Sequence, residues 1–248
     1  MAREARRLLI TPQRLAQAAG STAGPVLLPL DKQEAHYVQR VLRLRPGDPI
    51  ALVDGAGHRW PAAVEIGAAR LLVPLDQPAE VESPPAPSLQ LAVALPRQGS
   101  DVLLRMVCEL GIDLIQPLLA ERSVQEHWNA QRSAVILREA LEQCERLWLP
   151  QLEQPQPALP WLQAAAGVRF LATTRRPDVL PLAEALAATV PADASCISVA
   201  IGPEGGWSPA EEAQAIGSGW LPVSLGTTIL RTATAAVAAV AGLCSWRH

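Results

Sequence analysis

A glycine-rich passage at residues 202–206 has the composition that best suits ligand binding in this 248-residue sequence. It follows an apolar run and reads Gly-Pro-Glu-Gly-Gly, so its backbone can approach a ligand closely. In open α/β sheets, ligands bind beyond the carboxyl ends of the strands, where this passage would lie. Such loops are nevertheless more often structural than functional, and this one matches neither the GxGxxG nor the GxxxxGKS/T nucleotide pattern.

A helix is predicted to begin directly after this passage. Ser208 is a favourable N-cap, proline follows at the first helical position, and Glu211 completes a capping box. A second strand-to-helix passage covers residues 225–235 and reads LGTTILRTATA, with Thr232 placed to cap an alanine-rich terminal helix. Arg231 lies beside that helix start, where the helix dipole disfavours a cation, so it is either a surface arginine or a functional one.

Metal, disulfide and membrane chemistry are not indicated. The four cysteines are widely separated, with no CxxC pair and no nearby histidine cluster, so we expect reduced core cysteines and no metal site. The first ten residues are charged and lack the apolar run of a signal peptide. The small-apolar stretch at 233–244 is shorter than the roughly 20 residues that cross a bilayer. We therefore expect a cytoplasmic protein with no membrane partner.

The elements that would position the two passages alternate between strands and helices. Strands are predicted at 89–95, 112–119, 168–174, 195–202 and 220–226. Helices are predicted at 100–111, 129–147, 181–190 and 208–217. Alternation of this kind predicts an α/β domain with a mainly parallel sheet.

The first 80 residues follow a different pattern, in which short strands predict a small β-barrel. These strands are expected at 6–10, 49–54, 59–66 and 69–75. A helical stretch at 31–44 interrupts them and would place Arg40 and Arg43 on one face. Residues 81–88 hold three prolines and are predicted to be a linker, which gives domains at 1–80 and 89–248.

The average composition conceals an uneven charge. With 49% apolar and 18% charged residues the chain is not predominantly disordered, and its net charge of −3 argues against coating nucleic acid by charge alone. Residues 1–45, however, carry eight basic and three acidic side chains, a net +5. The remaining residues carry 13 basic and 21 acidic side chains, a net −8. The two ends of the chain therefore differ electrostatically.

Taken together, IGPEGGWSPAEE and LGTTILRTATA resemble the SPOUT class of S-adenosylmethionine-dependent RNA methyltransferases. More closely, the sequence is similar to the family that methylates N3 of a uridine in bacterial 16S ribosomal RNA. The resemblance covers almost the whole chain. HYVQRVLRLRPGDPIALVDGAG is similar to that family's N-terminal RNA-binding barrel of PUA type, and CELGIDLIQPLLAERS and EQCERLWLP are similar to its central segments.

The resemblance implies a SPOUT α/β domain with a deep trefoil knot. Knots are rare in proteins, so this expectation rests on the resemblance alone. It also implies a homodimer whose interface includes the terminal helix, with 16S ribosomal RNA or the small-subunit particle as partner. The cofactor would be S-adenosylmethionine, enclosed by the two passages and the turn after residue 172. The residues implied to bind it are Thr173, Ile201, Gly202, Pro203, Glu204, Gly205, Gly206, Leu225, Gly226, Ile229, Leu230 and Thr232.

Methylation of uridine N3 requires an imide nitrogen that is aligned and freed of its proton, so a cation near O2 and O4 would favour the reaction. We predict that Arg231 is this cation and that Glu204 orients the loop and the substrate. The target base must be splayed out, because its pairing edge reacts. A basic N-terminal domain suits phosphate contacts, although a solvated basic face is the alternative. The predicted RNA-binding residues are Arg6, Arg7, His36, Arg40, Arg43, Arg97, Arg105 and Arg122.

Three positions depart from the family pattern. Ala233 stands where the family usually has the glutamate of RTETA, Met106 where it has a lysine, and Trp148 where it has an arginine. These departures keep two alternatives open. One is a catalytically weakened paralogue that binds cofactor and RNA, and the other is a SPOUT methyltransferase for a different RNA nucleotide.

Overall fold

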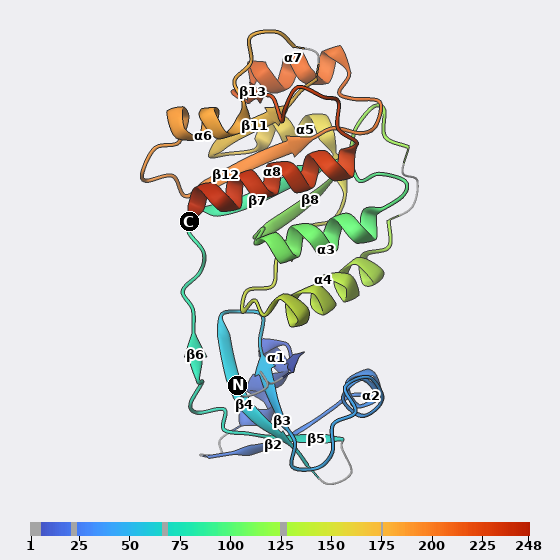
Figure 1. Ribbon diagram of the computed structural model, residues 1–248, viewed down its shortest axis with the longest axis vertical. Coiled ribbons are helices and arrows are strands. Elements are labelled where there is room, and N and C mark those ends of the chain that lie inside the picture. The colour runs from blue at the N-terminus through green and yellow to red at the C-terminus, as the bar shows by residue number, and fades with distance from the viewer. Residues whose placement is uncertain (1–5, 21–23, 66–68, 125–127, 175) are drawn as a thin grey trace. The chain divides into compact units, whose positions relative to one another are not determined.

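The computed structural model describes residues 6–20, 24–65, 69–124, 128–174 and 176–248, and the chain divides into two compact units (Figure 1). The first unit comprises Met1–Pro84 and Leu141–Leu149, and the second comprises Pro85–Ala140 and Pro150–His248. The segment Leu141–Leu149 falls inside the domain predicted at 89–248, yet its contacts group it with the first unit.

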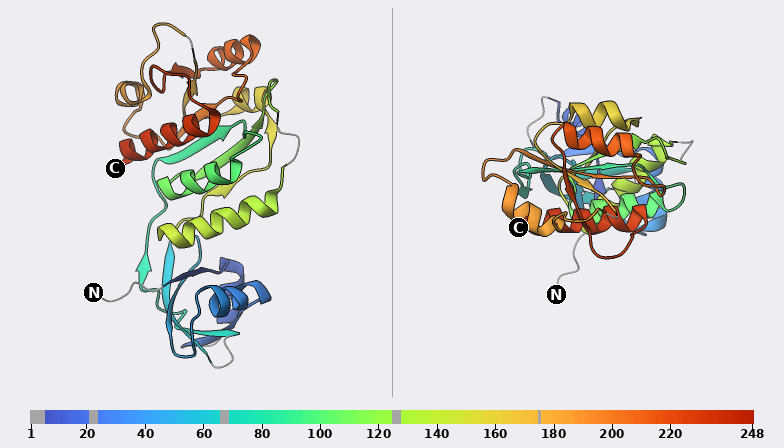
Figure 2. Two further views of the ribbon diagram at one scale, coloured as in Figure 1. Left: turned by 45° about the vertical axis from the view of Figure 1, so that its right-hand side comes forward. Right: turned by 90° about the horizontal axis from the view of Figure 1, so that it is seen from above.

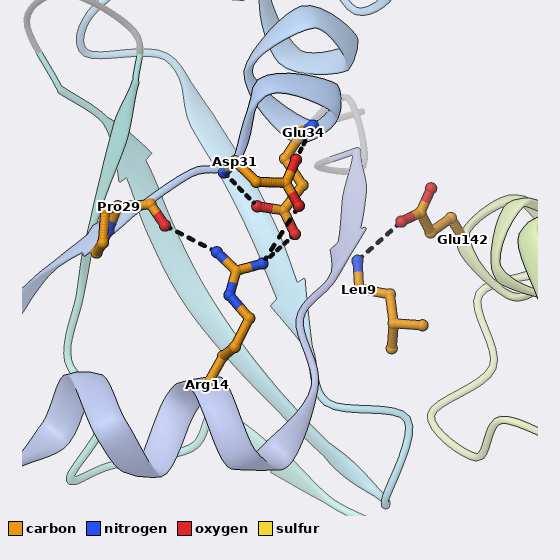
Figure 3. A network of polar contacts seen from close by, with 6 residues as sticks. All are labelled: Leu9, Arg14, Pro29, Asp31, Glu34 and Glu142. Carbon is orange, nitrogen blue, oxygen red and sulfur yellow. Dashed lines mark hydrogen bonds and ion pairs between the residues drawn. The ribbon is translucent and has the colours of Figure 1, made fainter.

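Several long-range contacts hold the segment Leu141–Leu149 in the first unit, among them backbone hydrogen bonds from the Gly57 amide to the Leu147 carbonyl and from the Leu149 amide to the Gly55 carbonyl. Glu142 is buried and accepts a hydrogen bond from the Leu9 amide at 2.8 Å, which ties it to strand β1 (Arg7–Leu9; Figure 3). The Arg7 guanidinium forms an ion pair with Glu145 at 3.3 Å and also donates to the Glu145 carbonyl. These residues therefore group with the first unit although they lie far from it along the sequence.

The first unit is built on a sheet in which the described strands follow the order β1-β3-β4-β5-β2, with β6 paired to β4. β1 runs parallel to β3 and the other pairs are antiparallel. Alternate residues of β4 are buried, as expected for a sheet with one face on a core. The elements are β1 (Arg7–Leu9), α1 (Pro12–Ala19), β2 (Val26–Pro29), α2 (Lys32–His36), the π-helix η1 (Tyr37–Val41), β3 (Pro49–Val53), β4 (His58–Val64), β5 (Arg70–Val73) and β6 (Glu80–Val81).

The strands predicted in this unit coincide with β1, β3, β4 and β5, although residue 66 at the end of one prediction lies outside the described residues. The sequence reasoning missed α1 and β2. Both are short, and α1 buries Leu15 alone among its residues, so neither carries a long periodic signal.

The helical stretch predicted at 31–44 is present from Lys32 to Val41, but it consists of α2 followed directly by the π-helix η1 and ends earlier than predicted. The Leu42 amide donates to the Tyr37 carbonyl at 2.9 Å, which is the wider spacing of a π-turn. Arg43 then adopts a left-handed conformation with φ +56°. The wide turn brings Leu42 against the core, and Arg43 does not share a helical face with Arg40 as the sequence had suggested.

A network of charged side chains fixes the start of α2 (Figure 3). The Asp31 carboxylate accepts from the Glu34 amide at 2.8 Å, and the Glu34 carboxylate accepts from the Asp31 amide at 2.9 Å. Arg14 of α1 pairs with the buried Glu34 and donates to the Pro29 carbonyl at 2.9 Å. The buried carboxylate is thus fully engaged, and α2 is tied to both α1 and β2.

The second unit contains a parallel sheet with the order β10-β8-β7-β12-β11-β13, and β9 also pairs with β8. Helices α5 and α7 cover one face, and α3, α6 and α8 cover the other (Figure 2). The elements are β7 (Ser88–Val93), α3 (Ser100–Leu110), β8 (Leu114–Leu119), α4 (Ala130–Cys144), β9 (Gln151–Leu152), β10 (Gln156–Pro157), α5 (Ala158–Ala164), β11 (Val168–Ala172), α6 (Leu182–Thr189), β12 (Cys196–Ile201), α7 (Pro209–Gly217), β13 (Leu221–Val223) and α8 (Thr232–Arg247).

The predicted α/β class with a mainly parallel sheet is confirmed, and every strand and helix predicted in this unit is present. The sequence reasoning missed α5, whose side chains pack on the α7 face of the sheet. Trp220 is fully buried there and donates from its indole nitrogen to the Leu162 carbonyl at 2.7 Å. Among the described residues, no helix has both the length and the apolar character that a membrane span requires.

Candidate functional site

A cavity of about 600 Å³ lies in the second unit, a volume typical of small-molecule sites. It forms where β11, β12 and β13 end, because these strands run parallel and are neighbours in the sheet. Its lining residues come from the segments that follow those three strands, together with Arg122. The lining is Arg122, Ala172, Thr173, Thr174, Arg176, Val179, Ile201, Gly202, Pro203, Gly205, Gly206, Trp207, Glu212, Ser224, Leu225, Gly226, Thr227, Thr228, Ile229, Leu230, Thr232 and Ala235.

The loop after β12, residues 202–207, is held in one conformation by contacts to other segments. The Gly206 amide donates to the Pro203 carbonyl at 2.8 Å, and Gly206 has a left-handed φ of +69°. Thr232 at the start of α8 donates its hydroxyl to the Gly202 carbonyl at 3.1 Å. The capping box that starts α7 is present as predicted, so the loop is fixed at both ends.

Glycine at position 202 leaves room for a neighbouring indole ring. Trp207 is buried and donates to the Ala172 carbonyl at 3.2 Å, which fixes the ring. A Cβ atom at Gly202 would lie 3.1 Å from that ring. A side chain at residue 202 would therefore crowd the ring, and glycine lets the backbone line the cavity without displacing it.

The loop after β13 also depends on a glycine. Gly226 has φ +139°, a conformation that residues with a side chain rarely adopt. The Ser224 hydroxyl accepts from the Gly226 amide at 3.1 Å and donates to its carbonyl at 2.9 Å. Beyond it, Ile229 lines the cavity although its side chain is largely exposed.

Thr173, in the segment after β11, carries a polar atom that points to a ligand. Its hydroxyl oxygen is buried and has no hydrogen-bond partner within the described part of the chain. Its amide is satisfied by the Val223 carbonyl at 3.0 Å. Buried hydroxyls are normally paired, so this one indicates a partner that enters the cavity.

Two arginines bring positive charge to the lining. Arg176 forms an ion pair with Glu212 at 3.0 Å, and Arg122 donates to the carbonyls of Gly205 and Trp207. The sequence reasoning assigned Arg122 to RNA and missed Arg176 and Trp207. The position of Arg176 just beyond the predicted strand at 168–174 was the available signal.

The residues implied to bind the cofactor come together with one exception. All of them line the cavity apart from Glu204, which is exposed. Arg231 is also exposed and outside the lining, but it lies between the lining residues Leu230 and Thr232. Its side chain makes no capping hydrogen bond, so its guanidinium is not used to start α8.

The residues predicted to bind RNA are exposed, with one exception. His36 and the arginines at 6, 40 and 43 are exposed in the first unit, and those at 97, 105 and 122 are exposed in the second. Arg7 differs, because its side chain is only 10% exposed and is engaged with Glu145. We therefore leave Arg7 out of the RNA-binding surface proposed below.

The three departures from the family pattern lie away from the cavity lining. Met106 is partly exposed on α3, and Ala233 is half-buried in the first turn of α8. Trp148 lies in the first unit, where a Cβ at Gly57 would come within 2.7 Å of its ring. None of the three is among the residues that line the cavity. Across the described ranges, no group of three or more metal-ligating side chains is present.

The sequence matches known RNA methyltransferases. Residues 83–243 match the model of an RNA methyltransferase domain, and residues 30–71 match that of an RNA methyltransferase PUA domain. The chain is 36% identical over 244 residues to the ribosomal RNA small subunit methyltransferase E of Synechocystis sp., covering 95% of this chain and 76% of the relative. The chain belongs to the small subunit methyltransferase E family of RNA methyltransferases.

Solved relatives of this RNA methyltransferase have the same fold over nearly its full length. A ribosomal RNA small subunit methyltransferase E from Neisseria gonorrhoeae, bound to S-adenosyl methionine, is 25% identical with a TM-score of 0.79 and 98% coverage of both chains. A putative methyltransferase from Legionella pneumophila, also solved with this cofactor, is 24% identical with a TM-score of 0.78 and the same coverage. The comparison supports the predicted mixed α/β fold with a parallel sheet.

Proposed function

We propose that this protein transfers a methyl group from S-adenosylmethionine to N3 of a specific uridine in the 16S ribosomal RNA of the small subunit. The observation that carries the proposal is the convergence of the loops at 202–207 and 224–232 on one cavity. The choice of uridine N3 rests on the resemblance of these two loop sequences to the uridine-N3 family.

The residues of the cavity fit S-adenosylmethionine. Its walls combine apolar side chains such as Ile201 and Leu230 with backbone groups of glycine-rich loops, as adenosine and methionine parts require. The buried hydroxyl of Thr173 lacks a partner that a bound molecule would supply. When bound, the cofactor supplies a reactive methyl group carried on a sulfonium.

The side chains next to the cavity suit activation of an imide nitrogen. Arg231 is exposed between two lining residues, so we propose that it faces the RNA base and stabilises negative charge on O2 and O4 as N3 loses its proton. Glu204 is exposed in the first loop and is proposed to orient the loop and the substrate. The loops around the cavity hold the reactants in line and exclude water.

The first unit is proposed to grip the RNA through residues 36–43. The segment is exposed and basic, and it contains a π-helix and the left-handed Arg43, features that are often found at functional sites. The network of Arg14, Asp31 and Glu34 fixes the start of α2, which leads into this segment. The target base, splayed from its neighbours, would then reach the cavity.

Arg40→Ala and Arg43→Ala are each expected to weaken RNA binding, because each removes one phosphate contact. The negative slope of log affinity against log salt concentration is expected to become shallower by about one in each variant. Filter binding of 16S ribosomal RNA fragments at several salt concentrations measures this slope. Arg59→Ala is the matched control, since Arg59 is already paired with Glu80 at 2.6 Å. Slopes equal to wild type in both test variants would exclude these residues from the RNA surface.

Gly226→Ala is expected to weaken binding of S-adenosylmethionine about tenfold. A side chain at φ +139° costs roughly 1–3 kcal/mol and moves the second loop away from its present path. Isothermal titration calorimetry measures the affinity. Gly24→Ala replaces another glycine of positive φ, outside the second unit, and is expected to bind the cofactor as wild type does. Equal affinities of Gly226→Ala and wild type would contradict the assigned role of this loop.

The proposal also includes a knot, a barrel and a homodimer. We propose a trefoil knot in the second unit, supported by the passage of the chain after β13 against Gly202, where Thr232 contacts it. Pulling on the two termini of a single molecule would give a shorter final contour length if the chain is knotted.

We propose a PUA-like barrel for residues 1–80, supported by the match to a PUA domain. Slow amide exchange in the outermost strands β1 and β2 would support closure.

We also propose a cytoplasmic homodimer that uses α8. This helix buries Ala236, Ala239 and Leu243 in its own unit, while small residues such as Ala235 and Ala241 remain half-exposed and permit close approach of a second helix. Sedimentation at micromolar concentration tests the assembly. A monomer under these conditions would contradict it.

Primer extension on ribosomal RNA from a deletion strain tests the main proposal, because N3-methyluridine cannot pair and stops reverse transcriptase. We expect one stop in 16S ribosomal RNA to disappear on deletion and to return with the wild-type gene. An unchanged stop pattern together with cofactor and RNA binding would favour the non-catalytic paralogue. Loss of a modification at a different nucleotide would favour the other SPOUT alternative.

A further inference from the structure

The turn directly after β8, residues 120–123, is a rigid support beside the first cavity loop. The Ala120 amide donates to the Ser123 hydroxyl at 3.0 Å, and the Ser123 amide donates to the Ala120 carbonyl at 3.0 Å. These two bonds close the turn on itself. The side chain of Arg122 therefore projects from a backbone with little freedom to move.

Arg122 reaches the loop at 202–207 and holds its backbone. Its Nη1 donates to the Gly205 carbonyl at 3.0 Å and to the Trp207 carbonyl at 3.3 Å. These carbonyls flank Gly206, whose left-handed conformation sets the direction of the loop. A Cβ at Gly205 would lie 3.1 Å from the Cβ of Arg122, so the glycine permits the close approach.

Glu211 fixes the same turn from the other side. One carboxylate oxygen accepts from the Glu121 amide at 2.9 Å, and the other accepts from the Ser208 amide at 2.9 Å. Glu211 is only 5% exposed, so both bonds are shielded from water. The turn after β8, the first cavity loop and the start of α7 are thus joined through two side chains, Arg122 and Glu211.

We infer that Arg122 is a positioning residue that holds the first loop in its cofactor-binding conformation, and that it is not an RNA contact. The inference rests on the proposed binding of S-adenosylmethionine in this cavity. It differs from the role expected from the sequence, where an exposed arginine at the end of a strand suggested the path of the RNA. The bonds to two backbone carbonyls assign the guanidinium to the loop instead.

Calorimetric titration of the full-length protein with S-adenosylmethionine tests the inference. We expect Arg122→Ala to raise the dissociation constant about tenfold or more, because the loop loses two hydrogen bonds from a charged donor. Arg122→Lys, which can still donate to one carbonyl, is expected to recover part of the affinity. The matched control is Arg132→Ala, which removes an exposed arginine that is hydrogen-bonded to Asp101 outside the cavity.

Three further measurements distinguish positioning from a general structural role. In Arg122→Ala, amides of residues 202–207 are expected to exchange faster while those of β12 stay protected. The KM for the cofactor is expected to rise, with kcat at saturating substrates changed less than threefold. Binding of RNA fragments is expected to stay within twofold of wild type.

The outcomes separate this inference from the proposed function. If the wild-type protein fails to bind S-adenosylmethionine, the proposed function itself is wrong. If wild type binds and both Arg122 variants bind equally well, the positioning role alone is overturned. Loss of RNA affinity with unchanged cofactor affinity would likewise overturn it and return Arg122 to the RNA path.

Discussion

Arg231→Ala is expected to lower kcat for methyl transfer about 100-fold or more while leaving the affinity for S-adenosylmethionine unchanged. The side chain is exposed, makes no capping bond to α8 and lies outside the cavity lining. The expectation rests on the proposed role of Arg231 at the RNA base, where negative charge would develop as N3 loses its proton. Removing a single positioned donor to such a charge typically costs about 10²–10³ in kcat.

Single-turnover methylation of small-subunit RNA, with cofactor binding measured in parallel, checks this expectation. Arg231→Lys keeps the charge but loses the planar fork of donors, so an intermediate rate is expected. Arg132→Ala serves again as the control, because Arg132 is an exposed arginine of α4 paired with Asp101. A normal rate in Arg231→Ala with bound cofactor would remove Arg231 from the mechanism.

The second large effect is expected on stability, from a buried ion pair between Arg247 and Asp113. Arg247 near the end of α8 pairs with Asp113 and donates to the Gly111 carbonyl at 3.0 Å. Asp113 also accepts from the Leu89 amide at 2.9 Å, and the two side chains are 8% and 13% exposed. Together they join the last turn of α8 to the beginnings of β7 and β8.

Arg247→Met is expected to lower the free energy of unfolding of the second unit by about 3–5 kcal/mol, because it removes the cation that faces the largely buried Asp113 carboxylate. Thermal denaturation should then show a midpoint lower by about 6–20 °C. Arg132→Met is the control, because its pair with Asp101 has side chains that are 67% and 40% exposed, and the midpoint should change by less than about 2 °C. Equal midpoints for Arg247→Met and wild type would show that the buried pair adds little.

The exposed pair of Arg132 and Asp101 also makes stability depend on pH. The hydrogen bond from Arg132 lowers the pKa of the Asp101 carboxyl, and the raised pKa of Arg132 follows from the same contact. A lowered carboxyl pKa stabilises the folded state above the unfolded pKa, and this contribution is lost as the pH falls through the folded value. Because both groups are exposed, solvent screens the effect, in keeping with the small change expected for the control.

The sequence by itself determined the elements whose signals are local. The capping box of Ser208 and Glu211 spans four residues, so its bonds depend on nearby atoms and were predictable. The glycines at 202, 205, 206 and 226 marked the loops that line the cavity, because glycine is retained where backbone needs space or unusual dihedral angles. Alternating strand and helix patterns gave the parallel sheet, whose strand ends bring those loops together.

The tertiary structure alone decided which side chains those elements bring into contact. Arg122 meets Gly205 across 83 residues and Thr232 meets Gly202 across 30, while Arg7 is engaged by Glu145 across 138. No local pattern encodes these partners, because they depend on how distant segments pack. The π-turn that begins at Tyr37 was not predicted either, and Leu42, whose amide closes it, is partly buried against the core of the first unit. The sequence thus located the cavity loops, whereas the packing of distant segments determined which partners the charged side chains around them contact.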